Sequence, residues 1–178
     1  TNRYSVPADK AYPNLVLRAY PFRIEVLYLD DVIASQPRCY GRQQDVLDPL
    51  HYLPLLEQRP GAFEHAKPLR RWREGWPQAY EHLLARLREK WPEGRGVREF
   101  VRILKLHKEH PAGLVQQAVE QALAYGCTHA DGVELCLRQL LHQNEPVLVL
   151  DLSDQPQLVG VGSQPPNLAR YEQLLERG

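Results

Sequence analysis

The sequence predicts an α+β protein: a small all-β barrel, then a compact antiparallel helical domain, then an extended tail punctuated by prolines. Short β-patterned runs joined by turn residues fill residues 1–46, and apolar residues at helical spacing dominate residues 77–143. Prolines interrupt short apolar pieces throughout residues 144–178. Residues 47–76 form a basic, proline-rich connector with short helices.

The barrel prediction depends on four short β-patterned runs, at residues 3–6, 15–20, 23–28 and 32–36. In the third run, Ile24, Val26 and Tyr28 alternate with more polar positions, which is typical of a half-buried strand. Four or five short strands within about 45 residues, joined by tight turns, favour a small closed barrel.

The connector begins with a helix-start signal. Asp48 is a good N-cap residue, and Pro49 suits the first helical position. Pro54 interrupts this helix after little more than one turn. We therefore expect residues 48–58 to form one or two short helical turns that cross the barrel.

Four helices are expected in the helical domain. Pro77 opens the first, a second covers residues 97–110, and Pro111 opens a third that stops at Gly126. The spacing Thr128-x-x-Asp131 resembles a capping box for the fourth. The first helix carries an apolar stripe made of Tyr80, Leu83, Leu84, Leu87 and Trp91.

The tail is predicted to dock onto a partner, because apolar residues between prolines seldom form a core of their own. A short helix is expected at its end. The candidate partner-binding residues are Leu150, Leu152, Leu158, Val161, Tyr171, Leu174 and Leu175.

Composition restricts the setting of the protein. No apolar run approaches the roughly 18 residues that span a bilayer, and three irregularly spaced cysteines favour a reducing compartment. We therefore expect a cytoplasmic protein without membrane contact, and the absence of Met indicates a piece of a longer chain. The zero net charge conceals a basic middle: residues 59–110 contain thirteen Lys or Arg against seven Asp or Glu.

Motifs for catalysis or metal binding are weak. The sequence lacks a hydrolase Ser motif, a phosphate-binding Gly loop and a metalloprotease helix. His107 and His110 could bind a metal, but a solvated helix end explains them better. Cys127, His129 and Cys136 lack a regularly spaced fourth ligand. We expect no catalytic residue, metal ligand or cofactor in this chain.

The basic middle contains the best candidates for phosphate contacts, because Arg guanidinium groups grip phosphates. Trp72 and Trp76 lie among these residues and either stack on bases or pack into the core; the sequence leaves both alternatives open. The arginines before residue 46 are diluted by acidic neighbours. The candidate DNA-binding residues are Arg18, Arg23, Arg38, Arg42, Arg59, Lys67, Arg70, Arg71 and Arg73.

The last two predicted helices could be mistaken for a helix-turn-helix. The would-be recognition helix offers Arg138, Gln139 and His142 against Asp131 and Glu134, too little positive charge for a DNA reader.

Taken together, the chain resembles the region after the catalytic domain of IstA-type insertion-sequence transposases, which are related to phage Mu transposase and retroviral integrases. The Asp-Pro-x-His-Tyr-Leu-Pro segment is the most specific feature. The motifs that carry the resemblance are Tyr4-Ser-Val-Pro7, Arg23-Ile-Glu-Val26, Arg38-x-Tyr-Gly-Arg42, Asp48-Pro-Leu-His-Tyr-Leu-Pro54 and Pro60-Gly-Ala62. One departure is Gln36, where relatives often have a His.

The resemblance implies an upstream catalytic domain whose Asp-Asp-Glu triad binds divalent metal; none of those carboxylates can be placed in this chain. It also implies that this region contacts transposon-end DNA, supports the transposase homodimer and engages an AAA+ helper ATPase of the IstB type. The alternative is a purely protein-interacting module for dimerisation or ATPase docking, whose arginines only solvate the surface.

Overall fold

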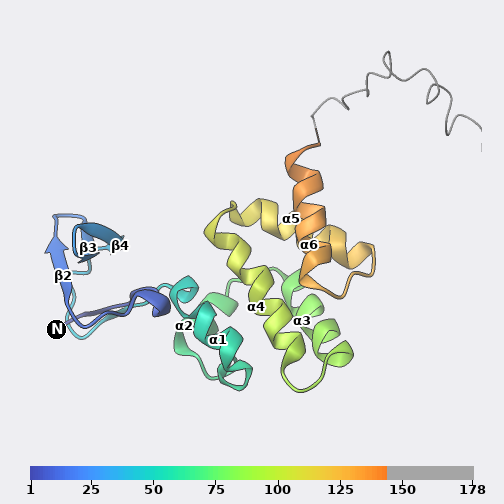
Figure 1. Ribbon diagram of the computed structural model, residues 1–178, viewed down its shortest axis with the longest axis horizontal. Helices are drawn as coiled ribbons and strands as arrows, with labels where there is room; N and C mark the ends of the chain where they lie inside the picture. Colours follow the sequence, from blue (N-terminus) through green and yellow to red (C-terminus); the bar gives the residue numbers. More distant parts are fainter. Residues whose placement is uncertain (144–178) are drawn as a thin grey trace, which may run out of the picture. The chain divides into compact units, whose positions relative to one another are not determined.

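A computed structural model describes residues 1–143 of the chain (Figure 1). The predicted tail, its terminal helix and its seven candidate partner-binding residues lie outside the described residues. Within residues 1–143, the predicted combination of a β-region and a helical domain is confirmed.

The β-region consists of an antiparallel sheet in the order β2-β3-β4 and a separate parallel pair, β1 with β5. The strands lie close to their predicted positions. In the three-stranded sheet, β3 is central, and Arg18 of β2 faces Glu25 of β3. The strand bounds are Arg3–Tyr4 for β1, Leu15–Ala19 for β2, Arg23–Tyr28 for β3, Asp31–Pro37 for β4 and Asp45–Val46 for β5.

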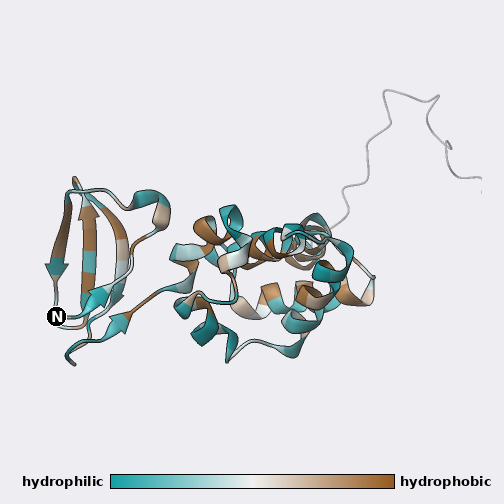
Figure 2. Cartoon of the chain, turned by 90° about the horizontal axis from the view of Figure 1, so that it is seen from below, coloured by the Kyte–Doolittle hydropathy of each residue, from teal (hydrophilic) through white to brown (hydrophobic). Residues whose placement is uncertain are grey.

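The predicted closed barrel is wrong. A barrel requires every edge strand to pair with a neighbour, but β1 and β5 are two residues long and pair with each other, so β2 and β4 remain the edges of an open sheet. Four of the five residues of β2 are exposed. Apolar residues consequently lie along strands that have no second sheet to cover them (Figure 2).

The helical domain contains six α-helices joined by short turns, and α3 packs on α4 while α5 packs on α6 (Figure 1). The helices α1 and α2 belong to the segment predicted as a connector with short helices. The bounds are Leu53–Gln58 for α1, Lys67–Arg73 for α2, Gln78–Lys90 for α3, Arg95–Lys105 for α4, Ala112–Ala124 for α5 and Ala130–Leu141 for α6.

The hydrophobic core lies in this helical domain. Its fully buried residues include Leu83 and Leu87 of α3, Phe100 of α4 and Val115 of α5. The predicted stripe of α3 is therefore confirmed for its Tyr and Leu positions, while Trp91 is half-buried after the helix end. Burying a Leu or Phe side chain stabilises a fold by about 1.5–3 kcal/mol, which makes this core the main source of stability.

The Asp48-Pro49 helix start is confirmed. The Asp48 carboxylate accepts a hydrogen bond from the Leu50 N–H at 2.9 Å, and a 3-10 turn, Pro49–Tyr52, leads directly into α1. Pro54 lies in the first turn of α1, where its missing N–H costs little. The predicted crossing over a barrel is wrong, because Leu53 and Leu56 are buried in the helical core.

The predicted capping box at Thr128 is also wrong. The Thr128 hydroxyl accepts a hydrogen bond from Lys90 at 2.6 Å instead of capping α6. The first N–H of α6, at Ala130, donates to the Glu99 carboxylate of α4 at 2.8 Å. A tertiary contact between two helices therefore replaces the local cap.

None of the helices described is both long and apolar enough to cross a membrane.

Candidate nucleic-acid interface

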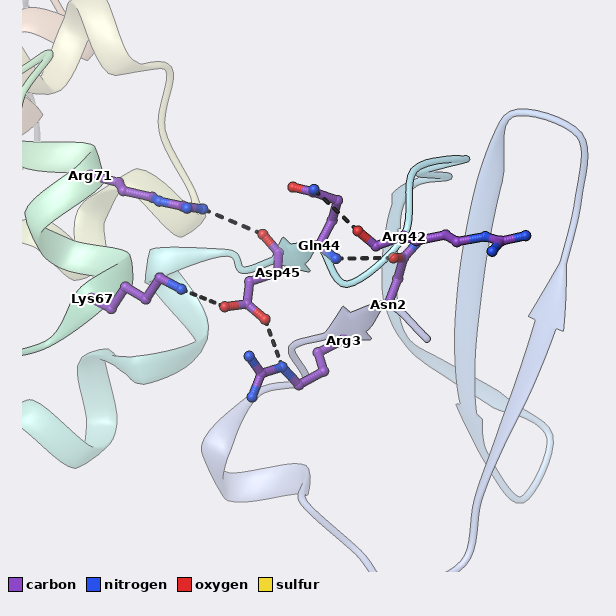
Figure 3. A network of polar contacts seen from close by, with 7 residues as sticks. All are labelled: Asn2, Arg3, Arg42, Gln44, Asp45, Lys67 and Arg71. Carbon is purple, nitrogen blue, oxygen red and sulfur yellow. Dashed lines mark hydrogen bonds and ion pairs between the residues drawn. The ribbon is translucent and has the colours of Figure 1, made fainter.

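A polar cluster that includes three cations is organised by Asp45 of β5. Its carboxylate accepts hydrogen bonds from Arg3 Nε at 2.7 Å and from Lys67 Nζ at 2.5 Å. The guanidinium of Arg71 donates to the Asp45 backbone carbonyl at 3.4 Å. Figure 3 shows the three cations converging on Asp45 from β1 and α2. We call Arg3, Asp45, Lys67 and Arg71 the Asp45 cluster.

Local structure explains why these residues meet. The parallel β1–β5 pair places Arg3 opposite Asp45 in register, although 42 residues separate them. Lys67 begins α2, and Arg71 follows it by four residues, which puts both on one face of that helix. The Asn2 side chain supports the arrangement by accepting a hydrogen bond from the Gln44 N–H at 3.1 Å (Figure 3).

The Asp45 cluster has more positive than negative charge. Arg3 and Lys67 pair with the Asp45 carboxylate and Arg71 contacts the Asp45 backbone carbonyl, so three cations accompany one carboxylate. The side chains of Arg3 and Lys67 are 79% and 58% exposed. Arg3 uses one of its five N–H groups on Asp45, and Lys67 uses one of three. The remaining donors border a groove of about 580 Å³ that Tyr4 and Tyr52 also line. This arrangement is suited to binding an anion such as a phosphate.

The carboxylate of Asp45 remains ionised in this setting. The hydrogen bond from Lys67, together with Arg3, holds the pKa of Asp45 below its ordinary value despite the opposing effect of burial. The side chain of Asp45 is only 9% exposed. Asp45 therefore acts as a fixed anchor that orients the cations.

The predicted residues Arg73, Trp72 and Trp76 have structural contacts. Arg73 donates to both carboxylate oxygens of Glu81 at 2.6 Å and to Glu64 at 2.8 Å. Both tryptophans pack edge-on in the aromatic part of the core, with ring centroids 5.6 Å apart. Of the two alternatives for the tryptophans, the structure confirms packing into the core.

The other predicted residues fall into two groups. Arg18, Arg42, Arg59 and Arg70 are exposed and have no carboxylate ion pair with any described residue. Arg42 extends away from Asp45 (Figure 3). Arg23 and Arg38 lie together at one end of the sheet. Arg23 pairs with Glu25, and Arg38 donates to the Tyr20 carbonyl, so these contacts involve no residue of the Asp45 cluster.

Asp45 itself was not predicted as a site residue. No local sequence signal marks it, because its role depends on a two-residue strand pairing across the length of the β-region. An acidic residue that organises three cations is visible only once the chain has folded.

A Ser-His-Asp chain is present but is structural. Ser5 Oγ lies 2.8 Å from His51 Nδ1, and His51 Nε2 lies 3.6 Å from the Asp48 carboxylate. Ser5 is buried, and its oxygen accepts hydrogen bonds from the Asp48 N–H and the Gln36 amide. With both lone pairs occupied, the hydroxyl is not free to act as a nucleophile. Gln36 is thereby also given a buried structural role.

His107 is not the solvated residue that the sequence predicts. It is half-buried, its Nε2 lies 3.0 Å from the Tyr80 hydroxyl, and burial lowers its pKa. Over residues 1–143, no three His, Cys, Asp or Glu side chains gather in a geometry that could hold a metal ion.

Comparisons with known proteins now bear on this geometry. The model of the family described as Mu transposase, C-terminal domain, matches residues 1–48. A transposase of Aminobacter aminovorans is 31% identical over 179 residues, which cover 97% of this chain and 34% of that protein. The predicted resemblance to a C-terminal transposase region is confirmed.

Further relatives agree. The transposases for insertion sequences IS1326/IS1353 of Pseudomonas aeruginosa and Shigella flexneri are each 31% identical over 183 residues, covering 97% of this chain. The chain spans about a third of the length of these curated relatives. No solved structure matches it.

The residues matched by the family model include only half of the Asp45 cluster. Arg3 and Asp45 lie within the matched residues 1–48, whereas Lys67 and Arg71 lie beyond them. The similarity to whole transposases continues across the helical domain, so both halves of the cluster belong to a region shared with those relatives.

Proposed function

We propose that this chain is an accessory DNA-binding and assembly region of a DNA transposase. It contacts transposon-end DNA, supports the transposase homodimer in the synaptic complex and contributes to recruiting an AAA+ helper ATPase of the IstB type. Cutting and joining of DNA belong to an upstream Asp-Asp-Glu catalytic domain with its divalent metal, and this chain supplies no catalytic residue or cofactor. The observation that carries the proposal is the excess of oriented cations in the Asp45 cluster.

Phosphate binding follows from how the cluster is built. A free Lys or Arg side chain loses conformational entropy when it is fixed on a ligand. Asp45 already holds Arg3 and Lys67 in place, so less of this entropy remains to be lost when DNA binds. Arg70 lies on the same helix as Lys67 and Arg71 and is exposed, which extends the basic surface. Contacts of this kind position a DNA backbone without reading its sequence.

The test is fluorescence anisotropy of a labelled transposon-end duplex at increasing salt concentration. Each neutralised phosphate contributes roughly 0.9 to the slope of log affinity against log salt. The triple variant Lys67→Gln, Arg70→Gln, Arg71→Gln is therefore expected to bind more weakly and to lower the steepness of that slope by about 2 to 3.

The matched control is Arg138→Gln in α6, an exposed position in the helix that lacks the charge of a DNA reader. It is expected to leave affinity and salt slope unchanged. Circular dichroism of each variant confirms that folding is retained. Wild-type binding that is absent or insensitive to salt would overturn the DNA-binding proposal.

A second candidate is the protein-interacting module. An apolar hollow of about 330 Å³ lies between α1 and the following segment, lined by Leu55, Leu56, Ala62 and Ala66. Leu55 is 47% exposed at its rim. Helper ATPase binding that survives the triple substitution, together with wild-type failure to bind duplex DNA, would favour this function.

A further inference from the structure

One end of the three-stranded sheet carries a cluster of aromatic and arginine side chains outside the Asp45 cluster. The turn between β2 and β3 contains Pro21 and Phe22, and the segment after β4 folds against it. The Arg38 N–H donates to the Phe22 carbonyl at 3.0 Å, and the Tyr40 hydroxyl donates to the Pro21 carbonyl at 2.6 Å. We call Tyr20, Phe22, Arg23, Arg38 and Tyr40 the hairpin-end cluster.

Cations and rings alternate in this cluster. The Arg23 guanidinium lies over the Tyr20 ring at 4.5 Å, and the Arg38 guanidinium lies over the Tyr40 ring at 4.7 Å. Arg38 also donates to the Tyr20 carbonyl at 3.0 Å, which ties the two pairs together. Hydrogen bonds orient the Tyr40 ring and the guanidinium groups of Arg23 and Arg38 on the surface.

The cluster is largely open to solvent. Phe22 is 89% exposed and Tyr40 is 71% exposed. Glu25 pairs with Arg23 at 2.6 Å, and no carboxylate among residues 1–143 forms an ion pair with Arg38. Exposed aromatic rings on the same surface as two arginines suit a ligand that combines flat rings with negative charge.

Single-stranded nucleic acid has that combination. Its unstacked bases offer faces for aromatic side chains and guanidinium planes, and its phosphates pair with arginine. In a duplex the base faces are covered by their neighbours, so an exposed Phe has nothing to stack on. The chemistry of the cluster therefore distinguishes unpaired from paired DNA.

We propose that the hairpin-end cluster binds unpaired nucleotides of single-stranded DNA, with Phe22 and Tyr40 stacking on bases and Arg23 and Arg38 contacting the phosphates. The inference rests on the proposed DNA-handling function but uses a surface other than the Asp45 cluster. The ligand of this surface is therefore DNA with unpaired nucleotides, such as a single-stranded flank.

The experiment measures anisotropy of a labelled oligo-dT of about 15 nucleotides, beside a duplex of equal length. Phe22→Ala is expected to weaken binding of the single strand roughly tenfold, the effect of losing one stacked base. Binding of the duplex is expected to stay unchanged. Phe22→Trp keeps a stacking face and is expected to restore single-strand binding.

Leu29→Ala is the matched control, because Leu29 is an exposed apolar residue in the turn that follows the other end of β3. It is expected to change neither affinity. Equal affinity of wild type and Phe22→Ala for the single strand would overturn the inference, as would an equal loss on single strand and duplex. Failure of the proposed function gives a different result: wild-type binding of the transposon-end duplex is absent or insensitive to salt, while the Phe22 effect on the single strand persists.

Discussion

The sheet and the helical domain of this chain are stabilised in different ways. The helical domain buries a continuous set of Leu, Val and aromatic residues between Leu53 and Leu137. The three-stranded sheet buries Ile24, Val26, Leu27 and Ala34, and none of these belongs to that core. Other apolar side chains of the sheet, such as Val16 and Leu17, are exposed.

Polar contacts link the elements of the β-region, whereas apolar packing links the helices of the helical domain. Ser5 links β1 to Gln36 of β4 and to Asp48 and His51 at the start of the helical segment. Asp45 links β1 and β5 to α2. The β-region, which has the weaker core, therefore carries the whole hairpin-end cluster and half of the Asp45 cluster, namely Arg3 and Asp45, while α2 supplies Lys67 and Arg71.

The largest effect is expected from Gly96→Ala in α4. A Cβ at this position would lie 2.2 Å from the Leu87 carbonyl oxygen of α3, so the two helices would have to separate. Overpacking against backbone costs at least about 1–3 kcal/mol. Urea denaturation followed by tryptophan fluorescence measures the loss, because Trp72, Trp76 and Trp91 all contact the helical core.

Gly113→Ala in α5 is the control for Gly96→Ala. Nothing lies within 4 Å of the Cβ that it would add, so helix propensity alone applies, and a gain of about 0.5–1 kcal/mol is expected. Equal effects of the two substitutions would contradict the close packing of α3 on α4.

An intermediate effect is expected from Ser5→Ala. The substitution leaves His51 Nδ1 and the Asp48 N–H without this partner, while the Gln36 amide keeps its hydrogen bond to the Ser5 carbonyl at 2.7 Å. An unsatisfied buried polar group costs about 1–3 kcal/mol. Hydrogen exchange is expected to speed up in β1 and β4 more than in α3 and α4.

Ser35→Ala, at an exposed position of β4, is the matched control and is expected to stay within about 0.5 kcal/mol of wild type. Uniform acceleration of exchange over the whole chain by Ser5→Ala would show that sheet and helices unfold as one unit. That result would remove the contrast between the two regions.

The smallest effect is expected from pH. Burial lowers the pKa values of His51 and His107. At His51 the charge of Asp48 acts in the opposite direction, but burial has the larger effect. The unfolded chain therefore binds protons more readily, so this stability is fully present above the ordinary pKa of about 6.5 and is lost as pH falls through it toward the folded value.

Urea midpoints measured between about pH 8 and 5.5 check this expectation. His51→Gln sharpens the comparison because His51 joins the β-region to the helical segment, whereas His107 contacts Tyr80 and Trp72 within the helical core. His51→Gln is expected to flatten the part of the acid-side decline in stability that His51 contributes. A stability that rises on acidification would contradict the assigned burial.

Much of the secondary structure could be predicted from the sequence. The alternation in residues 23–28 marked β3, and the apolar stripe marked α3, because both periodicities are local. The Asp48 cap was predictable for the same reason. Whether the strands close into a barrel could not be predicted, because an open sheet and a barrel have the same strand patterns and differ only in which edges pair.

The candidate sites divide in the same way. The sequence by itself determined that cations gather in residues 59–73 and that the chain resembles a transposase region. Only the tertiary structure decided which cations are already paired: Arg73 meets Glu64 and Glu81, while Lys67 and Arg3 share one anchored carboxylate and retain free donors. The physical reason is that charge is a property of a residue, whereas its capacity to bind an anion depends on neighbours brought close by folding.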